Sequence, residues 1–405
     1  MHVRTHPRRQ RRQRWQLRTK TRAAAGALAL LLGLAGLAGT AGAAVPASSA
    51  SSAAAPGDVV TAAPTSFHPL PGQPTGTKAW HITYRSTTAT GAPDVVSGTV
   101  IVPQDGRTGP RPLVTYAVGT VGLADQCAPS AGFPRGTTVE GNLIQLLTQR
   151  GWAVAVTDYE GLGTPGTHTY IVGRSEGHAV LDAARAALRL PGAGLAPDSP
   201  VGVMGYSQGG QAAGWAAELH DSYAPELNLK GTAAGGVPAD LVKATEFNDG
   251  RIGAGLVLMG AIGQDAAFPE LNLASYLNGK GRTAVAFFKQ HCVTTDTAVG
   301  LFKRISDVTV RNPLKEPDWQ RALHSSDLGT HAPDRPLRVY HGTQDEIVPY
   351  ESAALMRAAW CAKGATVDWD PVPQGGHGSS LLAGSVPAVN WLAGRFAGKP
   401  APNNC

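Results

Sequence analysis

The chain has 405 residues, of which 42% are hydrophobic, so it is long enough for one large domain with an insertion or for two modest domains. Its formal net charge of +6 is concentrated at the start, because residues 1–22 hold eight arginines and one lysine but no acidic residue. Without that segment, 26 basic residues face 29 acidic ones, a balance of about −3. The body therefore has no excess of basic residues, and nucleic acid is not an expected partner.

The basic start leads into a long apolar stretch that begins at Ala23 and ends in small residues, with an A-x-A pattern closing at Ala43. This order is typical of a secretory signal peptide over residues 1–43 and predicts a secreted protein. A retained membrane anchor is the alternative, because the apolar span approaches transmembrane length, but its many Ala and Gly residues favour cleavage. The RRQRR repeats resemble a twin-arginine signal without the residues that usually follow the pair, which leaves the export route open.

Residues 44–75 are rich in Ala, Ser, Pro and Thr and poor in large apolar groups, which predicts a flexible leader. Four cysteines follow, an even number that suits an oxidising compartment. They are Cys127, Cys292, Cys361 and Cys405, and their spacings match no zinc-binding pattern. Four cysteines allow three pairings, and the spacing alone does not choose among them.

Apolar runs of strand length alternate with helical stretches along the rest of the chain. The predicted strands are residues 80–85, 96–103, 113–118, 152–158, 201–205, 230–238, 337–342 and 365–372. The predicted helices between them are residues 139–151, 177–192, 211–220 and 350–364, three of which end at Gly or Pro. Such alternation predicts an α/β fold with a mostly parallel sheet covered on both faces, and ligands bind beyond the carboxyl ends of its strands.

The stretch GYSQGG places Ser207 between Gly205 and Gly209, where a predicted strand gives way to a predicted helix. A serine in G-x-S-x-G at such a junction sits in a strained turn, and the glycines leave room for the neighbouring backbone. The turn raises the hydroxyl above the sheet edge, where the helix N-terminus adds its positive dipole end. Ser207 is therefore the candidate nucleophile.

A serine hydroxyl needs a base, and the base needs a group that orients it. Asp345 lies in the loop after one predicted strand, and His377 lies in a glycine-rich loop after the last one. The order Ser207, Asp345, His377 is the order expected of an α/β-hydrolase. Glu346 is the rival acid, whereas Asp158 is expected to organise a loop and His341 to pack at the end of its strand. These three are the alternatives to the predicted triad.

The tetrahedral intermediate of acyl transfer needs hydrogen-bond donors for its oxyanion. The backbone N–H of Gln208, the residue after the candidate nucleophile, is one expected donor. The other is the backbone N–H of Thr120, in the loop after residues 113–118, where Gly119 lets the chain turn inward. An ordinary glycine turn is the alternative interpretation of that loop.

These motifs together resemble the secretory lipases of the Candida lipase A type, within the α/β-hydrolase superfamily. The resemblance runs from about residue 75 to the C-terminus and rests on GTVGLADQCAPS, TDYEGLGTPG, GYSQGG, HGTQDEIVP and GGHGSS, in that order. It implies the triad and the oxyanion donors named above. It also implies disulfides Cys127–Cys292 and Cys361–Cys405, each worth roughly 4 kcal/mol in the chain-entropy model. One departure is Val118, where relatives often carry His, and this weakens the assignment of Thr120.

The interval 239–334 lacks the strand–helix rhythm and holds apolar, mainly helical segments within an expected hydrolase domain over residues 76–405. By resemblance this insertion is a cap that shelters an acyl chain. Most of its apolar residues are expected to form the cap's own core, and a subset around residues 256–262, in an apolar run interrupted by glycines, is the candidate lining. The sequence therefore predicts a secreted serine esterase or lipase that acts on lipid or shorter acyl esters, without metal, cofactor or obligate protein partner. A peptidase or acyltransferase on the same fold, or a non-catalytic lipid-binding relic, are the alternatives.

Overall fold

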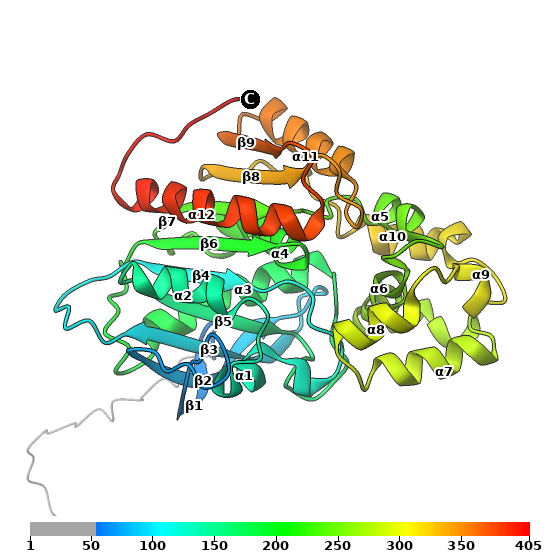
Figure 1. The fold of residues 1–405 in the computed structure, drawn as a ribbon, viewed down its shortest axis with the longest axis horizontal. Coiled ribbons are helices and arrows are strands. Elements are labelled where there is room, and N and C mark those ends of the chain that lie inside the picture. The colour runs from blue at the N-terminus through cyan, green and yellow to red at the C-terminus, as the bar shows by residue number, and fades with distance from the viewer. Residues whose placement is uncertain (1–53) are drawn as a thin grey trace, which may run out of the picture. The chain divides into compact units, whose positions relative to one another are not determined.

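The computed structural model describes residues 54–405, so the predicted signal peptide and the first part of the predicted leader lie outside the described residues. Within this range, nine strands form one sheet in the order β1-β2-β3-β5-β4-β6-β7-β8-β9 (Figure 1). The strands are β1 (Val59–Thr65), β2 (Thr77–Thr87), β3 (Pro93–Pro103), β4 (Leu113–Ala117), β5 (Ala153–Tyr159), β6 (Val201–Tyr206), β7 (Leu229–Gly235), β8 (Leu337–Gly342) and β9 (Val367–Val372). Pairing is antiparallel from β1 to β5 and parallel from β5 to β9.

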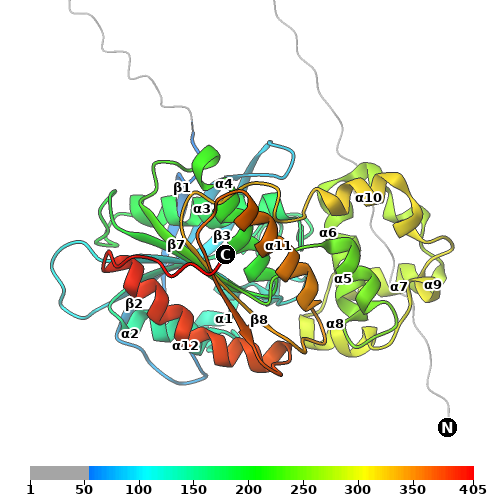
Figure 2. The ribbon, with the colours of Figure 1, turned by 90° about the horizontal axis from the view of Figure 1, so that it is seen from above.

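The described residues also form α-helices, some of which cover the two faces of the parallel part of the sheet. They are α1 (Pro129–Gly132), α2 (Gly141–Gln149), α3 (Gly173–Arg189), α4 (Gln208–Tyr223), α5 (Leu241–Asn248), α6 (Ala254–Ala267), α7 (Gly279–Phe288), α8 (Val293–Gly300), α9 (Ile305–Val308), α10 (Pro317–His324), α11 (Tyr350–Ala362) and α12 (His377–Phe396). Helices α3 and α4 pack together on one face, and α2 and α12 pack together on the other (Figures 1 and 2). Among the described helices, none combines the length and apolarity needed to cross a lipid bilayer.

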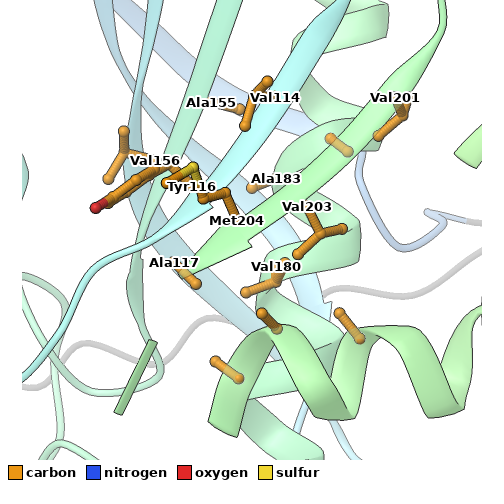
Figure 3. Close-up of a cluster of buried hydrophobic side chains, with 14 of the residues drawn as sticks. Val114, Tyr116, Ala117, Ala155, Val156, Val180, Ala183, Val201, Val203 and Met204 are labelled. Carbon is orange, nitrogen blue, oxygen red and sulfur yellow. The ribbon is translucent and has the colours of Figure 1, made fainter. Parts of the chain in front are cut away.

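The central strands are buried on both faces of the sheet, so their sequences do not alternate between polar and apolar residues. Every residue of β4, β5 and β6 is buried, because helices lie on both sides of them. Figure 3 shows part of this core, where Val203 of β6 lies near Val180 of α3 and Met204 of β6 lies near Tyr116 of β4. The predicted α/β architecture with a mostly parallel sheet is confirmed, and each of the eight predicted strands is present.

The prediction of a flexible leader through residue 75 is wrong for its described part, residues 54–75. Strand β1 pairs with β2, and Phe67 is 2% exposed and packs edge-on against Phe133. The sequence pattern missed β1 because most of its side chains are exposed and the strand is held by backbone pairing at the sheet edge. The folded domain therefore starts before residue 76.

Helices α5 to α10 fall between β7 and β8 and lie beyond one end of the sheet (Figures 1 and 2). They occupy the interval 239–334, which we call the helical insertion. It has its own apolar cluster, which includes Met259, Phe288 and Trp319. The same cluster takes in Tyr170 and Ile171 from the loop before α3, so the insertion packs against the loops at the sheet edge.

Two disulfides join distant segments, in the pairing that the family resemblance implies. Cys127–Cys292 connects the segment after β4 to the start of α8 in the helical insertion. Beside it, the backbone N–H of Val293 donates to the carbonyl of Val121 at 2.8 Å. Cys361–Cys405 connects α11 to the C-terminus, where Asn404 exchanges hydrogen bonds with Trp369 of the edge strand β9. The C-terminal segment therefore covers an edge that would otherwise expose unpaired backbone groups.

Replacing Cys361 and Cys405 together by Ala is expected to lower the free energy of unfolding by about 4 kcal/mol, because the bridge closes a loop over 44 residues. Guanidinium unfolding of the variant and the wild type measures the difference. A loss below about 1 kcal/mol would mean that the bonds of Asn404 alone hold the C-terminal segment.

Candidate active site

Ser207 lies in a strained turn between β6 and α4. Its backbone angles are φ 59° and ψ −123°, in a region that residues with side chains rarely occupy. The two flanking glycines are required by contact, because a Cβ on Gly205 would lie 2.1 Å from the carbonyl oxygen of Gly209, and a Cβ on Gly209 would lie 2.0 Å from that of Ala117. The backbone can therefore close this turn only with glycine at both positions.

The structure brings Ser207, Asp345 and His377 together. They follow β6, β8 and β9, and the C-terminal ends of these parallel strands lie at the same end of the sheet. The Nε2 of His377 lies 3.0 Å from the Oγ of Ser207, and its Nδ1 lies 2.8 Å from Oδ2 of Asp345. One imidazole ring thus bridges the hydroxyl and the carboxylate.

The surroundings of Asp345 keep its carboxylate ionised. Burial alone would raise the pKa of Asp345. Its other contacts outweigh burial and hold this pKa well below its ordinary value: hydrogen bonds from His341 and His377, the charge of His377 and the backbone N–H of Val348. Oδ1 accepts from the backbone N–H groups of Ile347 and Val348 at 2.9 and 2.8 Å. Because the ionised Oδ2 only accepts, Nδ1 of His377 carries the proton and Nε2 is free to accept from Ser207.

The alternative acid and base residues have other partners. Glu346 accepts the backbone N–H of His377 at 2.9 Å and does not contact its ring. Asp158 is buried and accepts from the Oγ of Ser97 at 2.7 Å and from the backbone N–H of Ser130 at 2.9 Å. The Nε2 of the buried His341 lies 3.1 Å from the carbonyl oxygen of Val348 and 3.4 Å from Oδ2 of Asp345. Of the candidate acids, only Asp345 reaches the His377 ring in the described residues.

The two predicted oxyanion donors lie beside Ser207. Gln208 is the next residue, and a Cβ on Gly119 would lie 3.9 Å from the Cβ of Ser207, which places the Thr120 loop against the serine. Within residues 54–405, the backbone N–H groups of Thr120 and Gln208 have no hydrogen-bond acceptor. Both groups are therefore available to a substrate oxygen.

Hydrogen bonds hold the loop that carries Thr120 at Val118, at Gly119 and at Thr120 itself. The hydroxyl of Tyr159 donates to the carbonyl of Val118 at 2.8 Å. The N–H of Gly119 donates to Oε1 of the buried Glu140 at 2.8 Å. The hydroxyls of Thr120 and Tyr170 lie 2.9 Å apart. Three hydrogen bonds thus hold this loop, and Val118 takes part through its backbone carbonyl.

The sequence analysis missed Glu140, which shapes this loop. Burial raises the pKa of Glu140, although hydrogen bonds from Tyr116 and Gly119 oppose the rise. It precedes α2, where an acidic residue is ordinary because it complements the helix dipole. No local pattern distinguishes a glutamate that faces solvent from one that tertiary packing turns inward.

A cavity of about 410 Å³ runs from Ser207 into the helical insertion. Its lining includes Leu256, Leu258 and Ala261 of α6 together with Leu273 and Phe288. Residues 256–258 and 260–261 of the predicted lining segment line it, whereas Met259 and Ile262 are buried in the insertion's own cluster.

In the described part of the chain, no group of three or more His, Cys, Asp or Glu side chains is placed to hold a metal ion.

A family model for secretory lipases matches residues 134–404. The chain belongs to the secretory lipase family. It is 33% identical over 348 residues to the secreted triacylglycerol lipase LIP4 of Malassezia globosa, with 81% of this chain and 75% of that protein covered. It is 30% identical over 383 residues to Lipase 10 of Candida albicans, with 87% and 80% covered.

Solved structures show the same fold. The X-ray structure of Candida antarctica lipase A in its closed state superposes with a TM-score of 0.78 at 28% identity, over 87% of this chain and 84% of that one. The rice cell wall degrading esterase LipA from Xanthomonas oryzae has a TM-score of 0.71 at 19% identity and shows the fold alone, over 85% and 100% of the two chains. The predicted α/β-hydrolase fold is confirmed.

The contacts of the serine turn lead to a stability prediction. Gly209→Ala is expected to lower the free energy of unfolding by about 1 to 3 kcal/mol, because the added methyl group overlaps the carbonyl of Ala117. Gly394→Ala in α12 is the control, since no described atom lies within 4 Å of a Cβ there and alanine favours a helix by about 0.5 to 1 kcal/mol. Thermal unfolding compares the two variants. Equal stability would contradict the packing of the turn.

Proposed function

We propose that this secreted esterase or lipase cleaves carboxylic esters of lipids through an acyl-enzyme on Ser207. The observation that carries the proposal is the His377 ring, which lies 3.0 Å from the Ser207 Oγ on one side and 2.8 Å from the Asp345 carboxylate on the other. The names of the curated relatives support the substrate class, because they include secreted triacylglycerol lipases.

In the first half of the proposed reaction, the Oγ of Ser207 attacks the ester carbonyl carbon while Nε2 of His377 takes the hydroxyl proton. The carbonyl oxygen becomes an oxyanion that accepts from the N–H groups of Thr120 and Gln208, each worth roughly 3 to 4 kcal/mol in the transition state. The imidazolium, stabilised by Asp345, then gives its proton to the departing alcohol oxygen as the carbon–oxygen bond breaks. The acyl group stays on Ser207.

Water completes the cycle by the same steps. His377 takes a proton from water as the water oxygen attacks the acyl carbon, and the oxyanion forms again at the same two donors. The proton then passes to Oγ of Ser207 as the acyl bond breaks. The products are the carboxylic acid, the alcohol and the restored serine.

The cavity in the helical insertion fits the acyl chain of such a substrate. It begins at Ser207 and continues between apolar side chains that include Leu256, Leu258 and Phe288. Each methylene group moved from water into such surroundings gains about 0.8 kcal/mol. A longer acyl chain therefore binds more tightly until it meets the end of the cavity.

Exposed side chains mark where the cavity reaches the surface. Val299, Lys303 and Arg304 line it and are exposed. Beside them, Leu301 and Phe302 are 42% and 64% exposed. Apolar side chains grouped at a mouth, with basic residues among them, favour contact with a lipid–water interface over uptake of single soluble molecules.

Asp345→Asn is expected to lower kcat on p-nitrophenyl butyrate by about 10³ to 10⁴-fold, because the imidazole loses the carboxylate that fixes its tautomer. Glu346→Gln and Asp158→Asn are the matched controls and should keep most of the activity, since neither residue contacts the His377 ring. An active Asp345 variant beside an inactive Glu346 variant would transfer the role to Glu346.

The matching p-nitroanilide separates ester from amide hydrolysis. The proposed function expects the ester to be cleaved far faster by the wild type and neither substrate by Ser207→Ala. Equal rates on the two substrates would favour a peptidase.

Leu258→Trp is expected to lower kcat/KM for p-nitrophenyl palmitate by about 10 to 100-fold and to leave the acetate nearly unchanged, because a larger side chain shortens the cavity. The comparison is an initial-rate series from acetate to palmitate, with emulsified triglyceride alongside. Leu355→Trp on α11 is the control, because Leu355 is 50% exposed and lies outside the cavity lining. An unchanged chain-length profile would place the acyl chain elsewhere.

A further inference from the structure

Glu176 of α3 is a buried acid that the proposed chemistry does not use. Its side chain is completely buried, and its Oε1 accepts two hydrogen bonds. One comes from the side-chain amide of Gln208 at 2.7 Å, and the other comes from the backbone N–H of Ile171 at 2.9 Å. Gln208 directly follows Ser207. The carboxyl group of Glu176 is therefore hydrogen-bonded to the residue next to the candidate nucleophile.

The amide of Gln208 is fixed by a second partner. Its nitrogen also lies 3.2 Å from Nε2 of His168, whose Nδ1 lies 3.0 Å from the carbonyl oxygen of Glu160. A carbonyl only accepts, so Nδ1 carries the proton and Nε2 is the acceptor for Gln208. Burial lowers the pKa of His168 to about 4, which keeps the ring neutral near pH 7. Both amide hydrogens of Gln208 are therefore engaged, and the side chain is locked beside the serine turn.

Ile171 is the second residue that Glu176 holds. Its φ of 61° is left-handed, which is costly for a β-branched residue and persists only where the surroundings impose it. Its N–H is held by Glu176, and its carbonyl accepts from the amide of Gln264 in α6 at 3.3 Å. Ile171 also lines the cavity beside Ser207. One carboxyl oxygen thus ties the serine turn to the cavity wall.

We propose that Glu176 is a positioning residue, which holds the backbone N–H of Gln208 and the backbone of Ile171 in place for ester cleavage without contacting the substrate. The inference rests on the proposed roles of Ser207 and of the Gln208 N–H. An oxyanion donor contributes fully only when it is fixed before the reaction, and a misplacement of about 1 Å can cost about 100-fold in rate.

The neutral form of Glu176 suits this position. The second carboxyl oxygen, Oε2, is buried and has no hydrogen-bond partner among the described residues, so a charge on it would be uncompensated. The titratable neighbours of the Glu176 carboxyl group are Tyr159 of β5, Tyr170 and the neutral His168, and Glu160 lies beyond His168. Helix α4 contributes the uncharged amide of Gln208. Burial raises the pKa of Glu176 to about 8 against the lowering effect of its two hydrogen bonds. Near pH 7 the group therefore places no negative charge beside the forming oxyanion.

The pH dependence follows from this protonation state. When the pH rises through about 8, Glu176 loses its proton and a negative charge appears next to Gln208, where negative charge also develops on the substrate oxygen. The barrier rises, so kcat falls on the alkaline side. The tyrosines do not account for this limb, because burial raises the pKa of Tyr170 and that of Tyr159 above their ordinary values.

The same titration changes stability with a definite sign. In the unfolded chain the carboxyl group loses its proton near pH 4.5, whereas the folded protein keeps it to about pH 8. The unfolded state binds fewer protons in this window, so the free energy of unfolding falls as the pH rises through it. Glu176→Gln lacks this titration, so the wild type should lose stability relative to the variant between these pH values.

The test compares Glu176→Gln and Glu176→Ala with the wild type on p-nitrophenyl butyrate across pH. Glu176→Gln keeps an acceptor oxygen, so it should retain kcat at pH 7 and lose the alkaline limb. Glu176→Ala should lower kcat by about 10 to 100-fold while KM changes little, because the donors are displaced and the cavity stays open. Glu246→Gln, at an exposed position of α5, is the control and should follow the wild-type profile.

Two outcomes would overturn the inference: an alkaline limb that is unchanged in Glu176→Gln, or wild-type kcat in a folded Glu176→Ala variant. If Glu176→Ala does not fold, the pH profile of Glu176→Gln still decides. Ser207→Ala distinguishes failure of the positioning role of Glu176 from failure of the proposed function. An active Ser207→Ala variant rejects the proposed function, whereas an inactive one beside unaffected Glu176 variants rejects only the positioning role.

Discussion

A single imidazole ring connects three loops that are far apart in the sequence. The two ring nitrogens of His377 face Ser207 and Asp345, and its backbone is held as well, because its N–H donates to Glu346 and its carbonyl accepts from Tyr206. These contacts fix the orientation of the His377 ring, so its Nε2 stays at hydrogen-bond distance from the Ser207 hydroxyl. In the proposed reaction, the Thr120 loop, the cavity and the buried acids around it serve ester cleavage only while this contact holds.

The parallel sheet makes that contact possible. Strands that run in one direction deliver their following loops to one edge, so residues more than 100 positions apart, such as Ser207 and Asp345, become neighbours. The close approach of β4, β6 and α4 at that edge leaves no room for a Cβ at Gly205 or Gly209. Backbone packing, not the serine itself, therefore fixes where the hydroxyl points.

The sequence predicted the parts of this arrangement that have a local pattern. Buried strands such as β4 and β6 appear as short apolar runs, and Ser207, Asp345 and His377 each stand in a glycine-containing or turn-forming loop directly after one. Strand β1 escaped prediction because it is an exposed edge strand held by backbone pairing. Glu140 and Glu176 escaped because a glutamate near or within a helix is normally solvated, and only tertiary packing makes these two interior. The leader boundary failed for the same reason, since Phe67 is buried by a partner 66 positions away, Phe133.

The bridge between Cys127 and Cys292 has a mechanical consequence. The helical insertion leaves the sheet after β7 and returns before β8, and a segment attached only at these two crossings could rotate about the line that joins them. The disulfide adds a third covalent connection, to the segment that continues from the Thr120 loop. Rotation of the whole insertion about that line is thereby restrained. In a reducing medium the third connection is lost and this restraint goes with it.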